Sequence, residues 1–170
     1  MTGAKGGFAV PRDFNELHNF QPVAWDQIPD LGLYMDQVIT FIGRIYQPLY
    51  GADMKSYLSA AMINNYVKGR LIPRPTGKKY SREQIALLIM IVALKQVSAM
   101  EEIRAMLTLR EGQTVEGLYA AFCRRFSEVI HSLSIDDAEP LNAALDFAIL
   151  SSGFRVGCVK ALKTDTPGAE

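Results

Sequence analysis

The chain has 170 residues, of which 49% are hydrophobic and 21% are charged, and this composition is typical of a folded globular protein. A chain of this length buries roughly 70% of its unfolded surface, so it needs no disulfide framework to fold. The longest uncharged apolar stretch in a helical pattern, Ile85 to Leu94, is too short to cross a bilayer. Cys123 and Cys158 lack metal-site spacing, and no signal-peptide pattern opens the sequence. We therefore expect a cytoplasmic protein with no cofactor, no metal site and no membrane association.

The charges balance in total, with 18 basic and 18 acidic residues, but they are unevenly placed. Seven Lys and Arg residues and no acidic residue lie between Lys55 and Arg82, so this window carries +7 and the remainder of the chain −7. Such a concentrated positive segment is typical of a compact phosphate-binding surface. A solvated basic face without a ligand is the plainer alternative, and charge alone does not decide between them.

Hydrophobic periodicity predicts an all-α fold with at most a two-stranded wing. Residues 1–30 are rich in glycine and proline and are expected to form an N-terminal arm that packs through Phe14, Phe20 and Trp25. Residues 31–110 are predicted to form the main domain.

The main domain is predicted to open with an amphipathic helix over about Leu33 to Leu49, because its apolar residues recur at i, i+3, i+4 and i+7. Ser59 is expected to cap a short helix that ends at Gly69. The segment 71–80 contains two prolines and a glycine, so it is expected to form an extended turn or hairpin that carries three cations.

Two capping boxes predict the helices that follow. Ser81 with Gln84 opens an almost wholly apolar helix to about Val97, which must be central to the core. Ser98 with Glu101 is expected to open a second, shorter helix.

Residues 111–170 are predicted to form a C-terminal helical region. Thr114 caps a helix with one apolar stripe, and Asp136 or Asp137 caps the last helix. The residues of the last helix that are expected to face inward are Leu141, Ala144, Leu145, Ala148 and Ile149.

The segment from Leu58 to Pro73, followed by Lys78-Lys79-Tyr80-Ser81 and Ser98-Ala99-Met100-Glu101-Glu102-Ile103, resembles the winged helix-turn-helix domain of MerR-type transcription regulators. In that family a capped recognition helix leads through a Gly-Leu-Ile-Pro type exit to a wing that closes on a basic pair and a tyrosine. The resemblance implies a MerR-like winged helix-turn-helix with an added C-terminal helical region, which would join two copies in a homodimer. It also implies an unidentified small-molecule or protein effector.

This sequence departs from the MerR pattern at four points. Asn64 stands where an arginine is usual, and Asn65 stands where a tyrosine is usual. Gly69-Arg70 reverses the expected order before the exit turn, and the wing is short.

The chain also looks like a family of uncharacterised bacterial proteins that share a domain of unknown function, across about Trp25 to Leu107. The segments that carry this second resemblance are Leu33-Tyr34-Met35-Asp36-Gln37-Val38, Met62-Ile63-Asn64-Asn65-Tyr66-Val67-Lys68 and Lys79-Tyr80-Ser81-Arg82-Glu83. No activity comes with it.

Double-stranded DNA is the partner that these segments favour. A short helix with small residues at its start can enter a major groove, and asparagine amides pair with adenine or with phosphate oxygen. The contacts are expected from the helix that starts at Ser59 and from the basic wing, Arg74 to Lys79. The expected DNA-binding residues are Ser59, Ala61, Asn64, Asn65, Lys68, Arg70, Arg74, Lys78, Lys79, Tyr80 and Arg82.

Several of these residues also have a plain structural interpretation. Helical spacing places Met62, Ile63, Tyr66 and Val67 in the core. The two asparagines are compatible with ordinary exposed amides, and anchoring of the wing is the more natural role for Tyr80.

The sequence does not favour an enzyme, because His18 and His131 are far apart and neither has a local catalytic partner. The hypothesis that competes with DNA binding is a protein-interaction adaptor that reuses the winged-helix fold. A continuous basic stripe over the Ser59 helix and the wing favours DNA, whereas an exposed apolar groove flanked by those cations favours the adaptor.

Overall fold

The structure, a computed structural model, describes residues 19–51, 54–132 and 140–164. Its elements in chain order are η1 (Trp25–Gln27), β1 (Leu33–Tyr34), α2 (Met35–Tyr50), α3 (Met54–Tyr57), α4 (Ala60–Lys68), β2 (Lys79–Tyr80), α5 (Arg82–Leu94), α6 (Met100–Leu107), α7 (Val115–Ser132) and α8 (Pro140–Thr164). The chain is thus mostly helical with one small two-stranded sheet, as predicted. The expected roles of Phe14, Asp136 and Asp137 lie outside the described residues.

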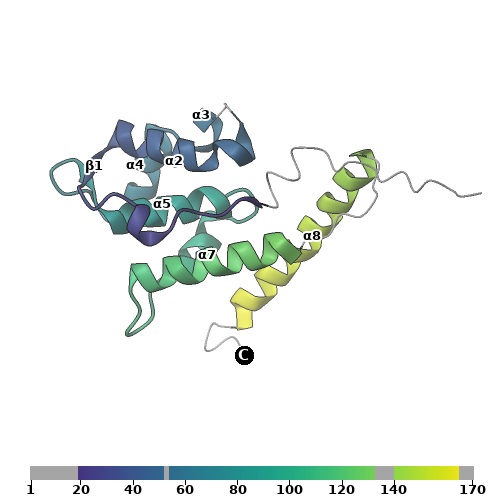
Figure 1. Ribbon diagram of the computed structural model, residues 1–170. Helices are drawn as coiled ribbons and strands as arrows, with labels where there is room; N and C mark the ends of the chain where they lie inside the picture. Colours follow the sequence, from purple (N-terminus) through teal and green to yellow (C-terminus); the bar gives the residue numbers. More distant parts are fainter. Residues whose placement is uncertain (1–18, 52–53, 133–139, 165–170) are drawn as a thin grey trace, which may run out of the picture.

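Helix α5 forms the centre of the molecule, with α2 on one side and α7 on the other (Figure 1). All nine residues from Gln84 to Val92 are buried. The predicted capping box is confirmed, because Ser81 Oγ accepts from Gln84 N at 3.4 Å and Gln84 Oε1 accepts from Ser81 N at 2.8 Å. The helix ends at Leu94, not at Val97, because Val97 N and Ser98 N both donate to Leu94 O and close a turn there.

The amphipathic helix α2 begins two residues later than predicted. Leu33 and Tyr34 form β1, and Tyr34 N donates to Gln37 Oε1 at 2.9 Å to start the helix at Met35. The buried Tyr46 hydroxyl donates to Ile89 O at 2.8 Å, which links α2 to α5.

The predicted hairpin is present, and its second strand also pairs with a distant segment. Lys79 N donates to Thr76 O at 3.0 Å, and φ is positive at both Gly77 and Lys78, which is the geometry of a type I′ turn. On its other side β2 pairs antiparallel with β1, with Leu33 opposite Tyr80. The small sheet therefore fixes the hairpin against the start of α2.

Helix α6 begins at Met100 with Ala99 as its N-cap, so the predicted box of Ser98 and Glu101 is shifted by one residue. The carboxylate of Glu102 accepts from Ala99 N at 2.8 Å. This register turns Ile103 and Leu107 into the core and leaves Glu101 exposed.

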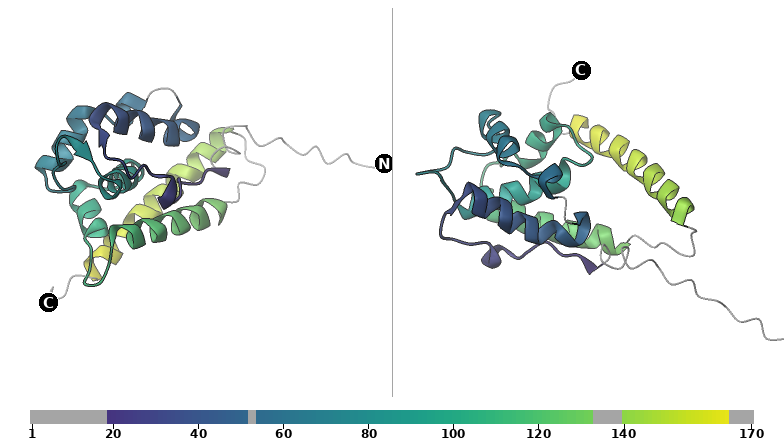
Figure 2. Two further views of the ribbon diagram at one scale, coloured as in Figure 1. Left: turned by 60° about the vertical axis from the view of Figure 1, so that its left-hand side comes forward. Right: turned by 90° about the horizontal axis from the view of Figure 1, so that it is seen from above.

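Helices α7 and α8 form the C-terminal region. The predicted Thr114 cap is confirmed, since Gly117 N donates to Thr114 Oγ1 at 3.1 Å. The buried Tyr119 of α7 donates its hydroxyl to Val23 O at 2.8 Å and so holds the segment before η1. Helix α8 lies at the periphery, away from α2 and α4 (Figure 1, Figure 2).

The expected inward face of α8 is wrong at Leu145 and Ile149, which are 58% and 60% exposed. The helix is turned by its contact with α6, where Arg155 bonds to Glu102 at 2.8 Å. Arg155 and Cys158 are half-buried, so the stripe that faces the protein lies further along the helix.

Helix α4 begins and ends as predicted, but an arginine occupies the position that favours glycine at its end. Ser59 Oγ accepts from Met62 N at 3.3 Å. At the other end Arg70 N donates to Val67 O and Leu71 N to Tyr66 O, the two bonds of a Schellman motif. The left-handed residue of that motif is Arg70, with φ 57°, whereas the preceding Gly69 has φ −74°.

We predict that Arg70→Gly stabilises the protein, because glycine adopts positive φ without the cost of about 1 kcal/mol that a side chain incurs there. The melting temperature should rise by about 2–4 °C, as measured by differential scanning calorimetry. Lys68→Gly is the matched control: it removes the same charge from a helical position and should lower the stability by about 1 kcal/mol. Equal effects of the two variants would contradict the strain at Arg70.

Candidate nucleic-acid interface

The outward face of α4 lines a shallow groove next to the start of the hairpin. Ile63 and Tyr66 point into the core, which leaves the polar residues of the helix exposed. The groove has a volume of about 520 Å³, and its lining residues are Ala61, Asn64, Asn65, Val67, Lys68, Arg74 and Pro75. No acidic residue is among them. The groove thus brings together five expected DNA-binding residues, which are Ala61, Asn64, Asn65, Lys68 and Arg74.

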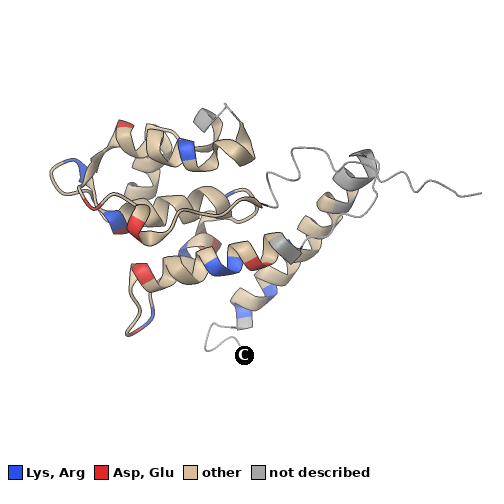
Figure 3. Cartoon of the chain, viewed as in Figure 1, with Lys and Arg blue, Asp and Glu red and all other residues tan. Residues whose placement is uncertain are grey.

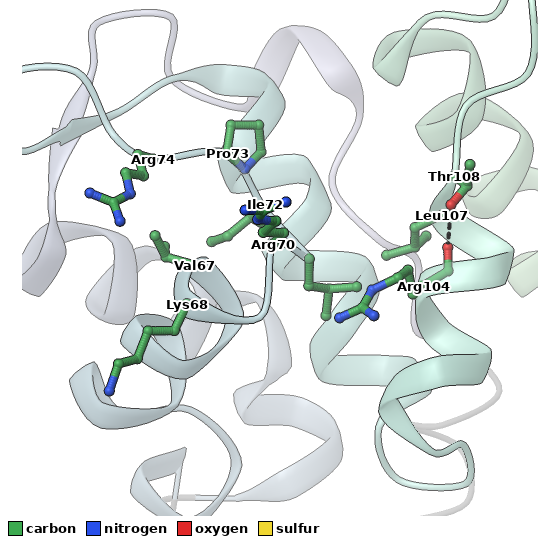
Figure 4. Close-up of a pocket in the computed structure, with 10 residues that line it drawn as sticks. Val67, Lys68, Arg70, Ile72, Pro73, Arg74, Arg104, Leu107 and Thr108 are labelled. Carbon is green, nitrogen blue, oxygen red and sulfur yellow. Dashed lines mark hydrogen bonds between the residues drawn. The ribbon is translucent and has the colours of Figure 1, made fainter.

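A second pocket, of about 630 Å³, adjoins the groove and shares Val67, Lys68 and Arg74 with it. Its further lining residues are Arg70, Leu71, Ile72, Pro73, Arg104, Leu107 and Thr108. Figure 4 shows Lys68 and Arg74 on one side in this view and Arg104 of α6 on the other, with Arg70 between them. Four cations surround the pocket without an acidic lining residue.

Helix α5 holds the start of the hairpin, at Pro73 and Arg74, in place. The buried Gln84 donates its Nε2 to Pro73 O at 2.9 Å, so the residue before Arg74 is fixed to the central helix. Gly32 and Lys79 approach closely in the small sheet, since a Cβ added to Gly32 would lie 3.0 Å from Lys79 Cβ. The start of the hairpin and its second strand, β2, are therefore both tied to the core.

Two exposed cations occupy strained backbone positions on this side of the molecule. Within the described residues, Arg70 and Lys78 are the non-glycine residues with positive φ, at 57° and 66°. Such conformations cost energy and cluster at functional sites. Figure 3 shows the basic hairpin loop projecting at the left of the view.

Three of the remaining expected site residues have structural roles: Ser59, Tyr80 and Arg82. Ser59 caps α4, and Tyr80 is only 2% exposed, where burial raises its phenol pKa. Lys79 Nζ lies 5.2 Å from the centre of the Tyr34 ring. Arg82 points away from the groove: its Nε donates to Ile28 O at 2.8 Å, and its guanidinium lies 3.7 Å from the carboxylate of Asp30.

Arg104 is the site residue that the sequence did not reveal. It lies on α6, and its guanidinium donates to Gly69 O at the end of α4. Helical spacing from the buried Ile103 and Leu107 places it on the flank of α6, but only the tertiary contact of α6 with α4 brings it to the pocket. Lys95 directly follows α5, and desolvation lowers the pKa of its ammonium group.

A comparison with protein families shows the family to which this chain belongs. A family model described as "Domain of unknown function (DUF1836)" matches residues 23–122. The chain therefore belongs to this family, and the match covers the groove, the hairpin and the second pocket but ends within α7 and leaves out α8. No curated protein and no solved structure matches the chain.

Two kinds of feature, a cluster of metal ligands and a membrane-spanning helix, are absent from the described part of the chain. Among the described residues, no group of three or more His, Cys, Asp or Glu side chains is arranged to hold a metal ion. None of the helices described here has both the length and the apolar character needed to span a bilayer.

The structural assignment of Arg82 predicts a loss of stability on substitution. Arg82→Gln should lower the free energy of unfolding by about 1–2 kcal/mol, because it removes a charged hydrogen bond to Ile28 O. Arg74→Gln is the matched control, since Arg74 is exposed in the groove, and it should change the stability by less than about 0.5 kcal/mol. Urea unfolding measures both, and a larger loss for the Arg74 variant would refute the assignment.

Proposed function

We propose that this protein binds double-stranded DNA and acts as a transcription regulator. The observation that carries the proposal is the groove over α4, in which asparagine amides and cations meet without an acidic residue. Basic surface and amide side chains on an exposed helix are the two components of duplex recognition.

In this proposal α4 enters the major groove. Its exposed face begins with the small Ala61, so the helix can approach the base edges closely, and Asn64 and Asn65 follow as donors and acceptors for adenine. Lys68 and Arg74 on the two sides of the groove then neutralise the flanking phosphates.

The hairpin supplies a second contact, in the manner of a wing. Lys78 lies at the tip of the type I′ turn and is exposed, so its ammonium group reaches beyond the sheet toward the adjacent backbone. The order α4, hairpin, α5 and α6 is the one that the resemblance to MerR-type regulators implies, and this resemblance supports the orientation. Of the originally expected contact residues we leave out Ser59, Tyr80 and Arg82, because the structure uses them in a cap, in the core and in an ion pair.

Fluorescence anisotropy with a labelled mixed-sequence duplex across a salt series tests the proposal. We expect micromolar binding at low salt and a log–log slope of about −0.9 for each phosphate neutralised. Lys78→Glu/Lys79→Glu should weaken binding and reduce the magnitude of the slope by about 2, because two phosphate contacts are lost.

The matched control for this double variant is Arg124→Glu/Arg125→Glu, which makes the same charge change at two exposed neighbours on α7. Its slope should equal that of the native protein. If the folded native protein does not bind at low salt, the regulator proposal fails, and the adaptor becomes the function to pursue by affinity capture.

We further propose that the protein is a homodimer joined through α8. In the described part of this helix five large apolar side chains are 45–62% exposed: Leu145, Ile149, Leu150, Phe154 and Val156. Helical spacing places Leu145, Ile149 and Val156 on one face of this helix, which is about 37 Å long, and this face gives two copies an apolar seam to share. Two copies would also present two α4 helices to successive half-sites of a duplex.

Multi-angle light scattering of the full chain should give the mass of a dimer. Ile149→Ser/Val156→Ser should shift it to a monomer, because both changes remove apolar area from the seam. Val97→Ser is the control, since Val97 is 53% exposed in the connection between α5 and α6 and does not belong to α8, and it should leave the dimer intact. A native monomer, or a dimer that persists in the double variant, would exclude this seam.

A further inference from the structure

The second pocket has features that a duplex-binding surface does not require. It is a hollow of about 630 Å³, within the range of small-molecule sites, and apolar side chains form part of its wall: Val67, Leu71, Ile72, Pro73 and Leu107. A DNA phosphate needs cations on an exposed surface, but it has no use for an apolar wall.

Three of the cations that line this pocket, Lys68, Arg70 and Arg74, are not needed to satisfy the carbonyls at the end of α4. The carbonyls of Tyr66 and Val67 already accept from the backbone N–H groups of Leu71 and Arg70. Within the described residues Lys68, Arg70 and Arg74 form no ion pair, so three positive charges surround the pocket uncompensated.

Arg104 is already fixed in the orientation that a ligand would need. One of its guanidinium nitrogens donates to Gly69 O, which ties the side chain across the gap between α6 and α4. A guanidinium has five N–H donors, so others stay available for an anion. Holding such a side chain in advance reduces the entropy that binding would cost.

We propose that this pocket binds a small organic phosphate monoester, with the phosphoryl group held by Arg70 and Arg104, with Arg74 adding its charge from the opposite side, and with the organic part on the apolar wall. A phosphate monoester carries a charge of about −1.5 to −2 at pH 7, and arginine forks match its oxygens in a bidentate manner. The strained Arg70 is retained because its charge serves this ligand.

Phenyl phosphate is the probe, because it joins a phosphoryl group to an apolar ring. Isothermal titration of the native protein without DNA should show binding, tighter than that of inorganic phosphate, and no binding of benzyl alcohol. Equal affinity for phenyl phosphate and benzyl alcohol, or no binding of phenyl phosphate, would overturn the proposal.

Arg104→Gln should weaken the binding of phenyl phosphate by about tenfold, because one charged hydrogen-bond donor is lost. Arg70→Gly should weaken it similarly while raising the melting temperature, so its loss of binding cannot come from unfolding. Arg44→Gln, on the exposed face of α2, removes a charge that lines neither pocket and should leave the affinity unchanged. If all three variants bind as the native protein does, the site lies elsewhere and the proposal is wrong.

One consequence rests on the proposed function. Because Lys68 and Arg74 line both the pocket and the groove, a bound phosphate monoester should compete for the charges that hold DNA. Phenyl phosphate should then weaken duplex binding in native protein more than in Arg104→Gln. The titration without DNA stands apart from this step, so a failure of DNA binding leaves the pocket proposal intact.

Discussion

The fold depends on the complete burial of α5. Nine consecutive buried residues cannot be covered by one partner helix, because a helix that is apolar all around needs cover on every side. Burying each large aliphatic side chain contributes about 1.5–3 kcal/mol, so this requirement outweighs any single polar contact in the molecule. Helices α2, α6 and α7 supply the cover, and the short α4 packs its Ile63 and Tyr66 into the same core.

This central helix also determines where charge can lie. Because α5 is buried from Gln84 to Val92, the neighbouring cations are exposed on α4, on its exit turn and on the hairpin: Lys68, Arg70, Arg74, Lys78 and Lys79. Gln84 is the polar exception on α5, and its two hydrogen bonds hold the hairpin entry and the cap of α5 together. The groove therefore adjoins a hairpin entry that is hydrogen-bonded to the buried central helix, and the proposed recognition of DNA would gain from a surface fixed in this way.

Local signals in the sequence predicted local structure well. The Ser59 cap, the Ser81 box and the inward faces of α4 depend on residues within a few positions of one another, and all are confirmed. The pairing of β1 with β2 and the arrival of Arg104 at the pocket depend on contacts across 35 or more residues, which periodicity does not encode. The orientation of α8 failed for the same reason, since an ion pair with α6 decides it.

The order Gly69-Arg70 connects stability with function. Exchanging the two residues would place glycine at the left-handed position and relieve the strain, at no loss of composition. The existing order instead puts a guanidinium at the junction of α4 and the second pocket, whose lining also includes Arg104 and Arg74. A stabler turn was available from the same two residues, and the proposed phosphate ligand gives the charge at position 70 a role that this turn would lack. Under that proposal stability and binding oppose each other at this residue, as they do at strained functional sites.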